Sequence, residues 1–207
     1  RCGMGSALVS LSAEDTASIA LELASGARVV LQRVPRGTPA DEVAAALDAL
    51  GTVLTVTSAP LAAPATTARL VDGRGLQREQ DWTDWDLHRD VLGTPAHPLV
   101  VLLDVSSGRA LARGAPHLLS WAGGVRIPQG DFVRPTRSEA ELLQGEAALA
   151  RALAEDPGFA GRHAGQLVAI DLLTRSMFTA RPDAQPLSVA REGLDQGIVY
   201  LGRVPSP

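Results

Sequence analysis

Two short apolar runs separated by a helix-like segment most constrain the fold of this chain. "RVVLQRV" (28–34) and "HPLVVLLD" (97–104) predict strands, and the second is a continuous apolar run suited to the centre of a sheet. Between them, "GTPADEVAAALDALG" (37–51) predicts a helix with Thr38 as its N-cap, and "TVLTVTS" (52–58) predicts a further strand. Strand, helix and strand in this order are typical of a parallel sheet with right-handed crossovers.

Two more helices are predicted in the same half of the chain. "SLSAEDTASIALELASG" (10–26) opens as a helix that Ser12 can cap. The segment 80–92 predicts a second helix, in which four side chains share one face: Trp82, Trp85, Arg89 and Leu92. Large aromatic side chains at this spacing favour packing, so we expect Trp82 and Trp85 in the core.

After a break in "PQGDFVRPTR", the C-terminal part predicts one helix and a small mixed unit. Residues 138–156 read as a helix that begins with Ser138 and Glu141 in capping-box spacing. "QLVAID" and "SMFTA" then predict two strands, "DAQPLSVAREGLDQG" a helix and "IVYLGRV" a last strand. This ββαβ unit has about 40 residues, which is too few to be firmly stable alone.

Together these segments predict an α/β protein in two parts. Residues 1–128 form a layered, mostly parallel sheet, residues 129–137 a linker, and residues 138–207 the helix with the α+β ββαβ unit. The region 166–204 also resembles small ββαβ appendages of bacterial proteins, which adds fold information and no activity.

All 19 basic residues are arginine, and the chain contains neither lysine nor asparagine. Three classes of enzyme depend on a lysine ammonium group: P-loop NTPases, protein kinases and pyridoxal enzymes. None of them can work by its usual means here. A GC-rich genome explains this bias, because lysine and asparagine codons are A-rich. The exclusion of these three enzyme classes does not depend on the cause of the bias.

Charge, cysteine and aromatic content exclude further classes. With a net charge of −4, scattered arginines and 3% aromatic residues, the chain offers nucleic acid neither a basic stripe nor a stacking surface. No apolar run approaches the length of a membrane span. The single cysteine, Cys2, rules out an internal disulfide and a multi-cysteine zinc site. We therefore expect a cytoplasmic protein with no cofactor.

Asp104 is the first candidate for chemistry. It ends the strand "LVVLLD", an apolar run followed by an acid, which is the form of a Walker B segment that holds magnesium. The competing interpretation is that Asp104 caps the helix that follows. No GxxxxGK[ST] loop accompanies it, so a nucleotide role would need an unconventional phosphate site built from backbone amides and an arginine such as Arg36.

The stretch "DWTDWDLHRD" (81–90) contains the elements of an acid–base or metal site. Asp84 and His88 are four residues apart and share a helical face. The other histidines lie in separate segments: His97, His117 and His163. Solvated or capping roles are therefore expected for Asp84 and His88. Neither G-x-S-x-G nor GxGxxG occurs, so serine hydrolysis and dinucleotide binding lack their motifs.

Three segments together resemble bacterial STAND-type P-loop NTPase domains: "RVVLQRVPRGTPADEVAAALDAL", "WDLHRDVLGTPAHPLVVLLD" and "RALARGAPHLLSWAGGVRI". In that family a helix bearing an arginine precedes an apolar strand, and a helix ending in an "APhhhSW" segment follows. Here that segment is "APHLLSW", which ends at Trp121, and the resemblance covers residues 25–128. Because the phosphate-binding loop is missing, the resemblance implies a degenerate, inactive domain. Such domains serve as scaffolds for association in bacterial conflict and signalling systems.

We therefore predict a non-catalytic scaffold or adaptor for protein–protein interaction in a bacterial system of this kind. Its partners are expected to be proteins, with an ATPase or protease encoded nearby as candidates, and neither nucleic acid nor membrane. The candidate residues for interaction or core packing are Trp82, Trp85, Arg89 and Trp121. Two alternatives remain open: a nucleotide- or metal-dependent hydrolase that uses Asp104, and a small-ligand sensor with a pocket near Asp104 and residues 35–38.

Overall fold

The two apolar runs lie side by side in a parallel sheet. In this computed structural model, which describes residues 11–35, 37–57, 66–128, 132–180 and 185–205, they form β1 (Val29–Arg33) and β4 (Leu99–Leu103). The strands pair in parallel, from Val29 opposite Leu99 to Arg33 opposite Leu103. Every residue of both strands is buried, which explains why neither run alternates between apolar and polar residues.

Among the described residues, this sheet has five strands in the order β2-β3-β4-β1-β5, all parallel. The other three strands are β2 (Thr55–Thr57), β3 (Arg69–Asp72) and β5 (Val125–Arg126). β2 follows β1 in the sequence but pairs with β3, so it lies at the edge of the sheet. The predicted layered, mostly parallel α/β domain is confirmed.

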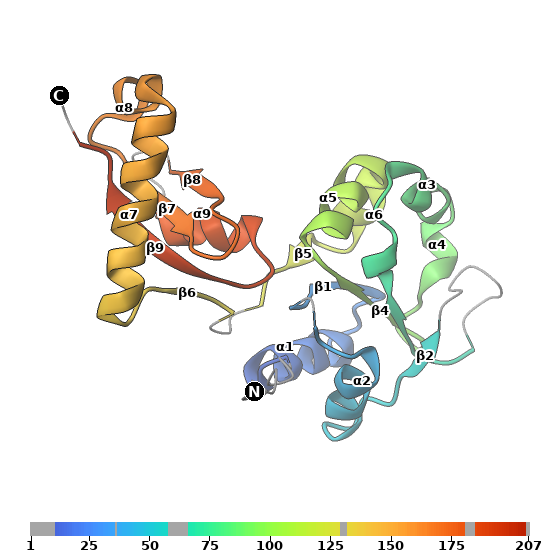
Figure 1. Cartoon of the computed structure of the whole chain (residues 1–207). Helices are drawn as coiled ribbons and strands as arrows, with labels where there is room; N and C mark the ends of the chain where they lie inside the picture. The colour runs from blue at the N-terminus through green and yellow to red at the C-terminus, as the bar shows by residue number, and fades with distance from the viewer. Residues whose placement is uncertain (1–10, 36, 58–65, 129–131, 181–184, 206–207) are drawn as a thin grey trace, which may run out of the picture. The chain divides into compact units, whose positions relative to one another are not determined.

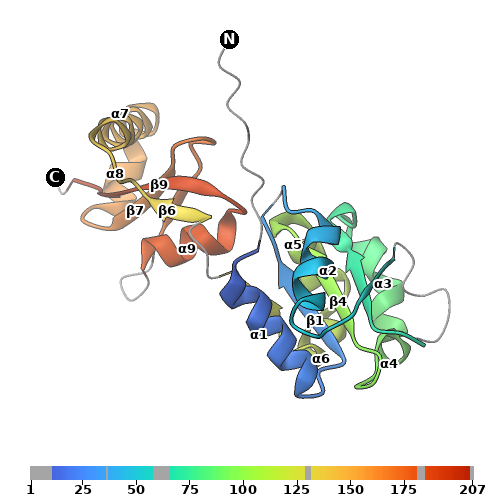
Figure 2. The same ribbon diagram turned by 90° about the horizontal axis from the view of Figure 1, so that it is seen from below.

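Helices cover both faces of this sheet (Figure 1, Figure 2). One face packs against α1 (Ala13–Ala24) and α2 (Ala40–Asp48). The other packs against α3 (Glu79–Leu87), α4 (Arg89–Leu92), α5 (Val105–Gly114) and α6 (Pro116–Trp121). A short 3-10 turn, η1 (Gly73–Gly75), follows β3. Within the described residues, no helix is both long and apolar enough to cross a membrane.

Trp82 and Trp85 lie in the core on the α3 side. Trp82 is fully buried, and its Nε1 donates a hydrogen bond to the carbonyl oxygen of Leu76 at 2.8 Å. The two indole rings meet edge to face, with centroids 5.1 Å apart. Trp121 is half-buried at the end of α6, where the guanidinium of Arg28 lies 5.7 Å from its ring centroid. These three tryptophans therefore have packing partners within the unit.

The predicted helix over 80–92 is broken into two. At His88 the backbone leaves the helical region, with φ −108° and ψ 19°, so α3 ends there and α4 begins at Arg89. The Nη1 of Arg89 donates to the carbonyl oxygen of Asp86 at 2.9 Å, one of the carbonyls left open where α3 ends. Arg89 thus stabilises the break between the two helices.

The second unit spans Asp131–Pro207. Its described strands form a mixed sheet in the order β6-β9-β7-β8: β6 (Val133–Pro135), β9 (Gly197–Arg203), β7 (Leu167–Asp171) and β8 (Met177–Thr179). One face packs against α7 (Glu139–Glu155) and α8 (Pro157–His163), and the other against α9 (Pro186–Gly193). The predicted ββαβ order is confirmed by β7, β8, α9 and β9.

Residues 133–135, which we placed in a linker over 129–137, form β6 of this second sheet. β6 is an edge strand parallel to β9, a position that tolerates Pro135 although proline has no N–H to donate. A strand of three residues that contains an arginine and a proline has no periodic pattern to reveal it. The first unit accordingly ends at Gly130.

α7 approaches β9 at a glycine. A Cβ atom added to Gly145 would lie 2.2 Å from Cγ of Tyr200, far inside van der Waals contact. The ring of Tyr200 is half-buried at this contact, and burial raises the pKa of its hydroxyl, with the charge of Glu146 adding to the effect. The helix can therefore pack on the strand at this depth only where no side chain is present.

Replacing Trp82 with alanine is expected to lower the free energy of unfolding by about 3–5 kcal/mol, because the core closes only in part around the lost indole. Urea denaturation followed by circular dichroism measures this change. Leu87→Ala is the matched control on the same helix, since Leu87 is 69% exposed, and its effect should stay within about 0.5 kcal/mol. Equal effects of the two substitutions would contradict the core position of Trp82.

Gly145→Ala is expected to destabilise the second unit by about 1–3 kcal/mol, because the added methyl group collides with Tyr200. The sign is informative, since alanine usually stabilises a helix interior by roughly 1 kcal/mol relative to glycine. Gly161→Ala in α8 is the control, because a Cβ at Gly161 would meet no atom within 4 Å. Thermal unfolding of both variants checks the difference. Stabilisation by both substitutions would show that the close contact is absent.

Candidate functional site

The carboxyl ends of the parallel strands meet at one edge of the first sheet. α2 follows β1 on one face, whereas α5 follows β4 on the opposite face. Because β1 and β4 are neighbours, the chain leaves the edge in opposite directions between them. Parallel α/β proteins bind their ligands at such a topological switch point. This edge is therefore where a site is expected.

One arginine crosses the switch point. Arg74, in η1, donates from Nε to Oδ1 of Asp72 at 2.7 Å and from Nη2 to Oδ2 at 2.5 Å. Its Nη1 donates to the carbonyl oxygen of Thr38, in the loop between β1 and α2, at 2.7 Å. Since β4 lies between β3 and β1, the Arg74 side chain must pass the carboxyl end of β4. We refer to Asp72, Arg74 and Thr38 as the edge clamp.

The charges within the edge clamp are matched. The side-chain hydrogen bonds from Arg74 lower the pKa of Asp72 below its ordinary value and outweigh the opposite effect of partial burial. Thr38, which we predicted to be the N-cap of α2, is buried but does not cap it. The helix begins at Ala40, with Pro39 at the capping position and no side-chain cap. Thr38 instead presents its carbonyl oxygen to Arg74.

Asp104 lies at the same edge, and it caps α5. Its Oδ1 accepts a hydrogen bond from the backbone N–H of Ser107 at 2.7 Å, and the Ser107 hydroxyl oxygen accepts one from the N–H of Asp104 at 2.9 Å. Asp104 is 3% exposed and Ser107 is fully buried. The two residues thus form a reciprocal capping box at the start of α5, which gives each of them a structural role. Of the two interpretations open from the sequence, the geometry is that of the cap.

The histidines do not come together with acids as a metal site. In the described parts of the chain, no three or more His, Cys, Asp and Glu side chains are grouped so as to hold a metal ion. Nδ1 of His88 lies 2.8 Å from the backbone carbonyl oxygen of Asp84 and does not pair with its carboxylate. His88 therefore has the expected role at a helix end.

Asp86, which lies near His88 in the stretch 81–90, has its partners in α6 and not in its own helix. Its Oδ1 accepts from the backbone N–H of Leu118 at 2.6 Å, and its Oδ2 lies 2.8 Å from Nδ1 of His117. Asp86 thus caps the start of α6 from α3, a tertiary contact that bears on stability and not on chemistry.

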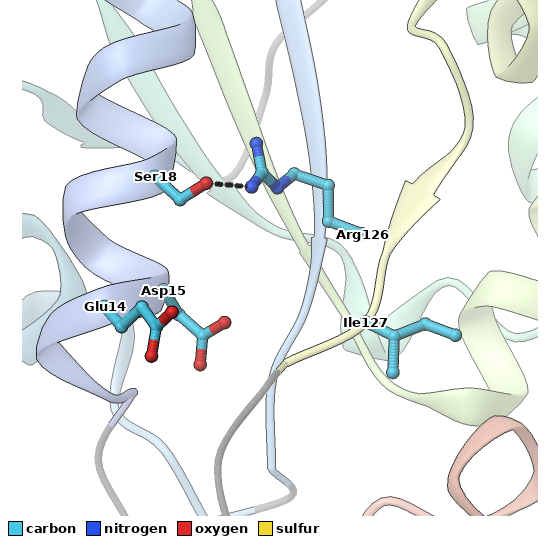
Figure 3. Close-up of a pocket in the computed structure, with 5 residues that line it drawn as sticks. All are labelled: Glu14, Asp15, Ser18, Arg126 and Ile127. Carbon is cyan, nitrogen blue, oxygen red and sulfur yellow. Dashed lines mark hydrogen bonds between the residues drawn. The ribbon is translucent and has the colours of Figure 1, made fainter. Parts of the chain in front are cut away.

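A cavity of about 280 Å³ opens beside the carboxyl end of β5 (Figure 3). The first turns of α1 supply Glu14, Asp15 and Ser18, and the end of β5 supplies Arg126 and the adjoining Ile127. Figure 3 shows the carboxylates of Glu14 and Asp15 next to each other, whereas the guanidinium of Arg126 is directed toward Ser18. The lining therefore has an acidic end and a basic end.

Arg126 is held at the basic end by two residues of α1. Its Nη2 donates to the hydroxyl oxygen of Ser18, and its Nη1 forms an ion pair with Oε1 of Glu22. The ion pair is close but not aligned as a hydrogen bond. The positive charge of Arg126 is thus directed to Ser18 and Glu22.

Sequence reasoning did not find the cavity. Glu14 and Asp15 read only as first-turn acids of a helix, and Arg126 carried no assigned role. Ser18 and Arg126 are 108 residues apart in the chain, so no local spacing could have joined them. Arg36, proposed for a phosphate site, and Cys2 lie outside the described residues.

Arg74→Gln is expected to raise the pKa of Asp72 toward its ordinary value of 3.8, because the variant loses the charged hydrogen bonds that hold the carboxylate. An NMR titration of the Asp72 side-chain carboxyl carbon measures it. The folded-state pKa is the lower one, so the ion pair stabilises the fold above the unfolded-state pKa and loses this contribution as the pH falls through the folded-state pKa.

Arg78→Gln is the control for this titration, since Arg78 pairs with Asp81 and not with Asp72. The pKa of Asp72 should not change in it. A pKa of Asp72 that is the same in wild type and Arg74→Gln would show that the edge clamp does not form.

Comparisons with known proteins give this edge no assigned activity. The chain matches no protein-family model, no curated protein and no solved structure. The geometry of the described strands supports a statement about the fold alone: they form a parallel five-stranded sheet, consistent with a Rossmann-like or P-loop-like fold.

Proposed function

We propose that the chain is a non-catalytic protein-interaction scaffold of a bacterial signalling or conflict system, and that its first unit is a degenerate relative of STAND-type NTPase domains. The observation that carries the proposal is the edge clamp, because it occupies the place where a parallel α/β protein of this kind would bind phosphate.

A triphosphate needs inward-pointing N–H groups and an uncompensated positive charge. The edge clamp offers neither. The loop after β1 directs the carbonyl oxygen of Thr38 toward the guanidinium of Arg74, and that guanidinium is already paired with the carboxylate of Asp72. An incoming phosphate would therefore have to displace a bidentate ion pair, and the chain has no lysine to compensate.

The position of Asp104 argues against the hydrolase alternative. Magnesium prefers several oxygen ligands in near-octahedral order, with carboxylates that face the ion. Here the buried carboxylate of Asp104 accepts from the N–H of Ser107 within its own helix turn. Using it as a ligand would remove the cap of α5, a loss of about 0.5–2 kcal/mol in stability.

The edge strand β2 supports the interaction role. Three apolar side chains are exposed around it: Leu50, Val53 and Val56. The segment "TVLTVT" (52–57) contains no charge and no proline, which are the usual means of protecting a sheet edge from other chains. A neutral, apolar edge of this kind is suited to contact with another protein, for which an ATPase or protease encoded nearby is our candidate.

The test is thermal unfolding with ATP or GTP, each with Mg²⁺. The scaffold proposal expects no change in Tm, whereas a nucleotide present at a hundred times its Kd would add about 2.7 kcal/mol of stability. Nucleotide turnover is measured in parallel for wild type and Asp104→Ala. A rise in Tm, or turnover that Asp104→Ala abolishes, would overturn the proposal. Turnover equal in both proteins would point to a contaminant and leave the absence of a Tm change as the supporting result.

A further inference from the structure

We propose that the outer edge of β2 binds an extended segment of the partner protein as an added strand, with uncharged β-branched residues at its centre and basic residues at its ends. The proposal rests on the scaffold function, and it names the form and the charge of the segment that the partner supplies. Its basis is the position of β2 at the edge of the described sheet, in contact with the acidic helix α2 (Figure 1).

The backbone at β2 has hydrogen-bonding groups that the pairing with β3 does not use. The N–H of Thr55 donates to the carbonyl oxygen of Ala68 at 3.0 Å. The parallel register then places Val56 opposite Leu70. Because a planar trans peptide points its C=O and its N–H in opposite directions, the C=O of Leu54 and both backbone groups of Val56 face away from β3. No residue in the described ranges pairs with these three groups, so another strand can bind to them.

The side chains at this edge favour an extended, uncharged segment. Val53 is 71% exposed and Val56 is 41% exposed, and both are β-branched. Thr55, which lies between them in the sequence, is exposed as well. Side chains of this type pack well against β-branched side chains of a neighbouring strand. A helix could cover the same side chains but would leave the outward backbone groups unpaired, so the geometry favours a strand.

The charge near β2 determines the ends of the bound segment. α2 packs against β2 and exposes three carboxylates, those of Asp41, Glu42 and Asp48. The segment 38–57, which contains both elements, has no basic residue. A segment with basic ends is therefore attracted to this edge. A second copy of the chain would bring the same three acids, and the repulsion between like charges disfavours it as the occupant.

The arginine of the neighbouring strand does not offset these acids. Arg69 of β3 lies opposite Thr55, but it is only 8% exposed. Its Nη2 donates to the carbonyl oxygen of Leu92 at 2.5 Å. Leu92 belongs to the core on the α3 side of the sheet, whereas α2 covers the other side. The charge of Arg69 is therefore directed away from the face on which the three carboxylates lie.

The experiment is a titration of the full chain with the peptide RVTVTVR, its termini blocked, followed in ¹H–¹⁵N spectra and by amide hydrogen exchange. We expect saturable shifts at Val56 and slower exchange of its N–H, which gains an acceptor. The N–H of Thr55 should exchange as before, because it already donates to Ala68. Binding should weaken as the salt concentration rises.

Two further peptides separate the charge from the hydrogen bonds. EVTVTVE should bind about fivefold more weakly than RVTVTVR or worse, since its ends carry the same charge as the acids of α2. RVTPTVR keeps the basic ends, but its central proline has no N–H to donate. It should bind about tenfold more weakly than RVTVTVR.

Asp48→Asn should weaken the binding of RVTVTVR by about two- to fivefold, because it removes one of the three carboxylates. Glu155→Gln is the matched control, since Glu155 is likewise an exposed acid at the last residue of a helix, α7. It should bind like wild type. Val56→Pro removes the outward N–H and should abolish binding, while the pairing of β2 with β3, which does not use this N–H, is kept. RVTPTVR tests hydrogen bonding at the same edge without any change in the chain.

The proposal is overturned if no saturable shift occurs at Val56, if EVTVTVE or RVTPTVR binds as tightly as RVTVTVR, or if Asp48→Asn and Glu155→Gln bind equally. Shifts at Val56 that appear without peptide as the protein concentration rises would assign the edge to a second copy, and they would overturn it too. Failure of the scaffold function is a separate result, because it is seen as a rise in Tm with nucleotide, whatever the peptides do.

Discussion

Burial of β1 and β4 on both faces is the constraint on which the first unit depends. Two adjacent strands without a polar face must be covered from both sides, so α2 and α5 leave them in opposite directions. The carboxyl edge between the strands is then left open to solvent or a ligand unless side chains fill it. In this chain the Arg74 side chain does so, anchored by Asp72 and held against Thr38.

The same edge has two different ends. At the switch point the guanidinium of Arg74 is paired with the carboxylate of Asp72, and Asp104 is turned into the first turn of α5. Beside β5 the arginine of the edge is drawn aside by Ser18 and Glu22, and Glu14 is left facing a cavity.

Local signals predicted most of the fold. The composition of β4, the spacing of Trp82 and Trp85, and the capping box at Ser138 each depend on residues close in sequence. The sequence did not predict the break at His88, because the helical spacing of apolar residues continues across it.

The candidate site depends on contacts that the sequence pattern does not reveal. Asp104 had two interpretations from its position alone, and only the Ser107 hydrogen bonds distinguish them. Arg74 and Thr38 are 36 residues apart in the sequence. They meet because β3 and β1 lie on either side of β4, so that the segments after both strands are at the same edge of the sheet. The most direct measurement follows these atoms: ¹H–¹⁵N spectra of the loop amides at Gly37, Thr38 and Ala40 during titration with inorganic triphosphate and Mg²⁺. The account predicts that these resonances do not move, and saturable shifts confined to them would contradict it.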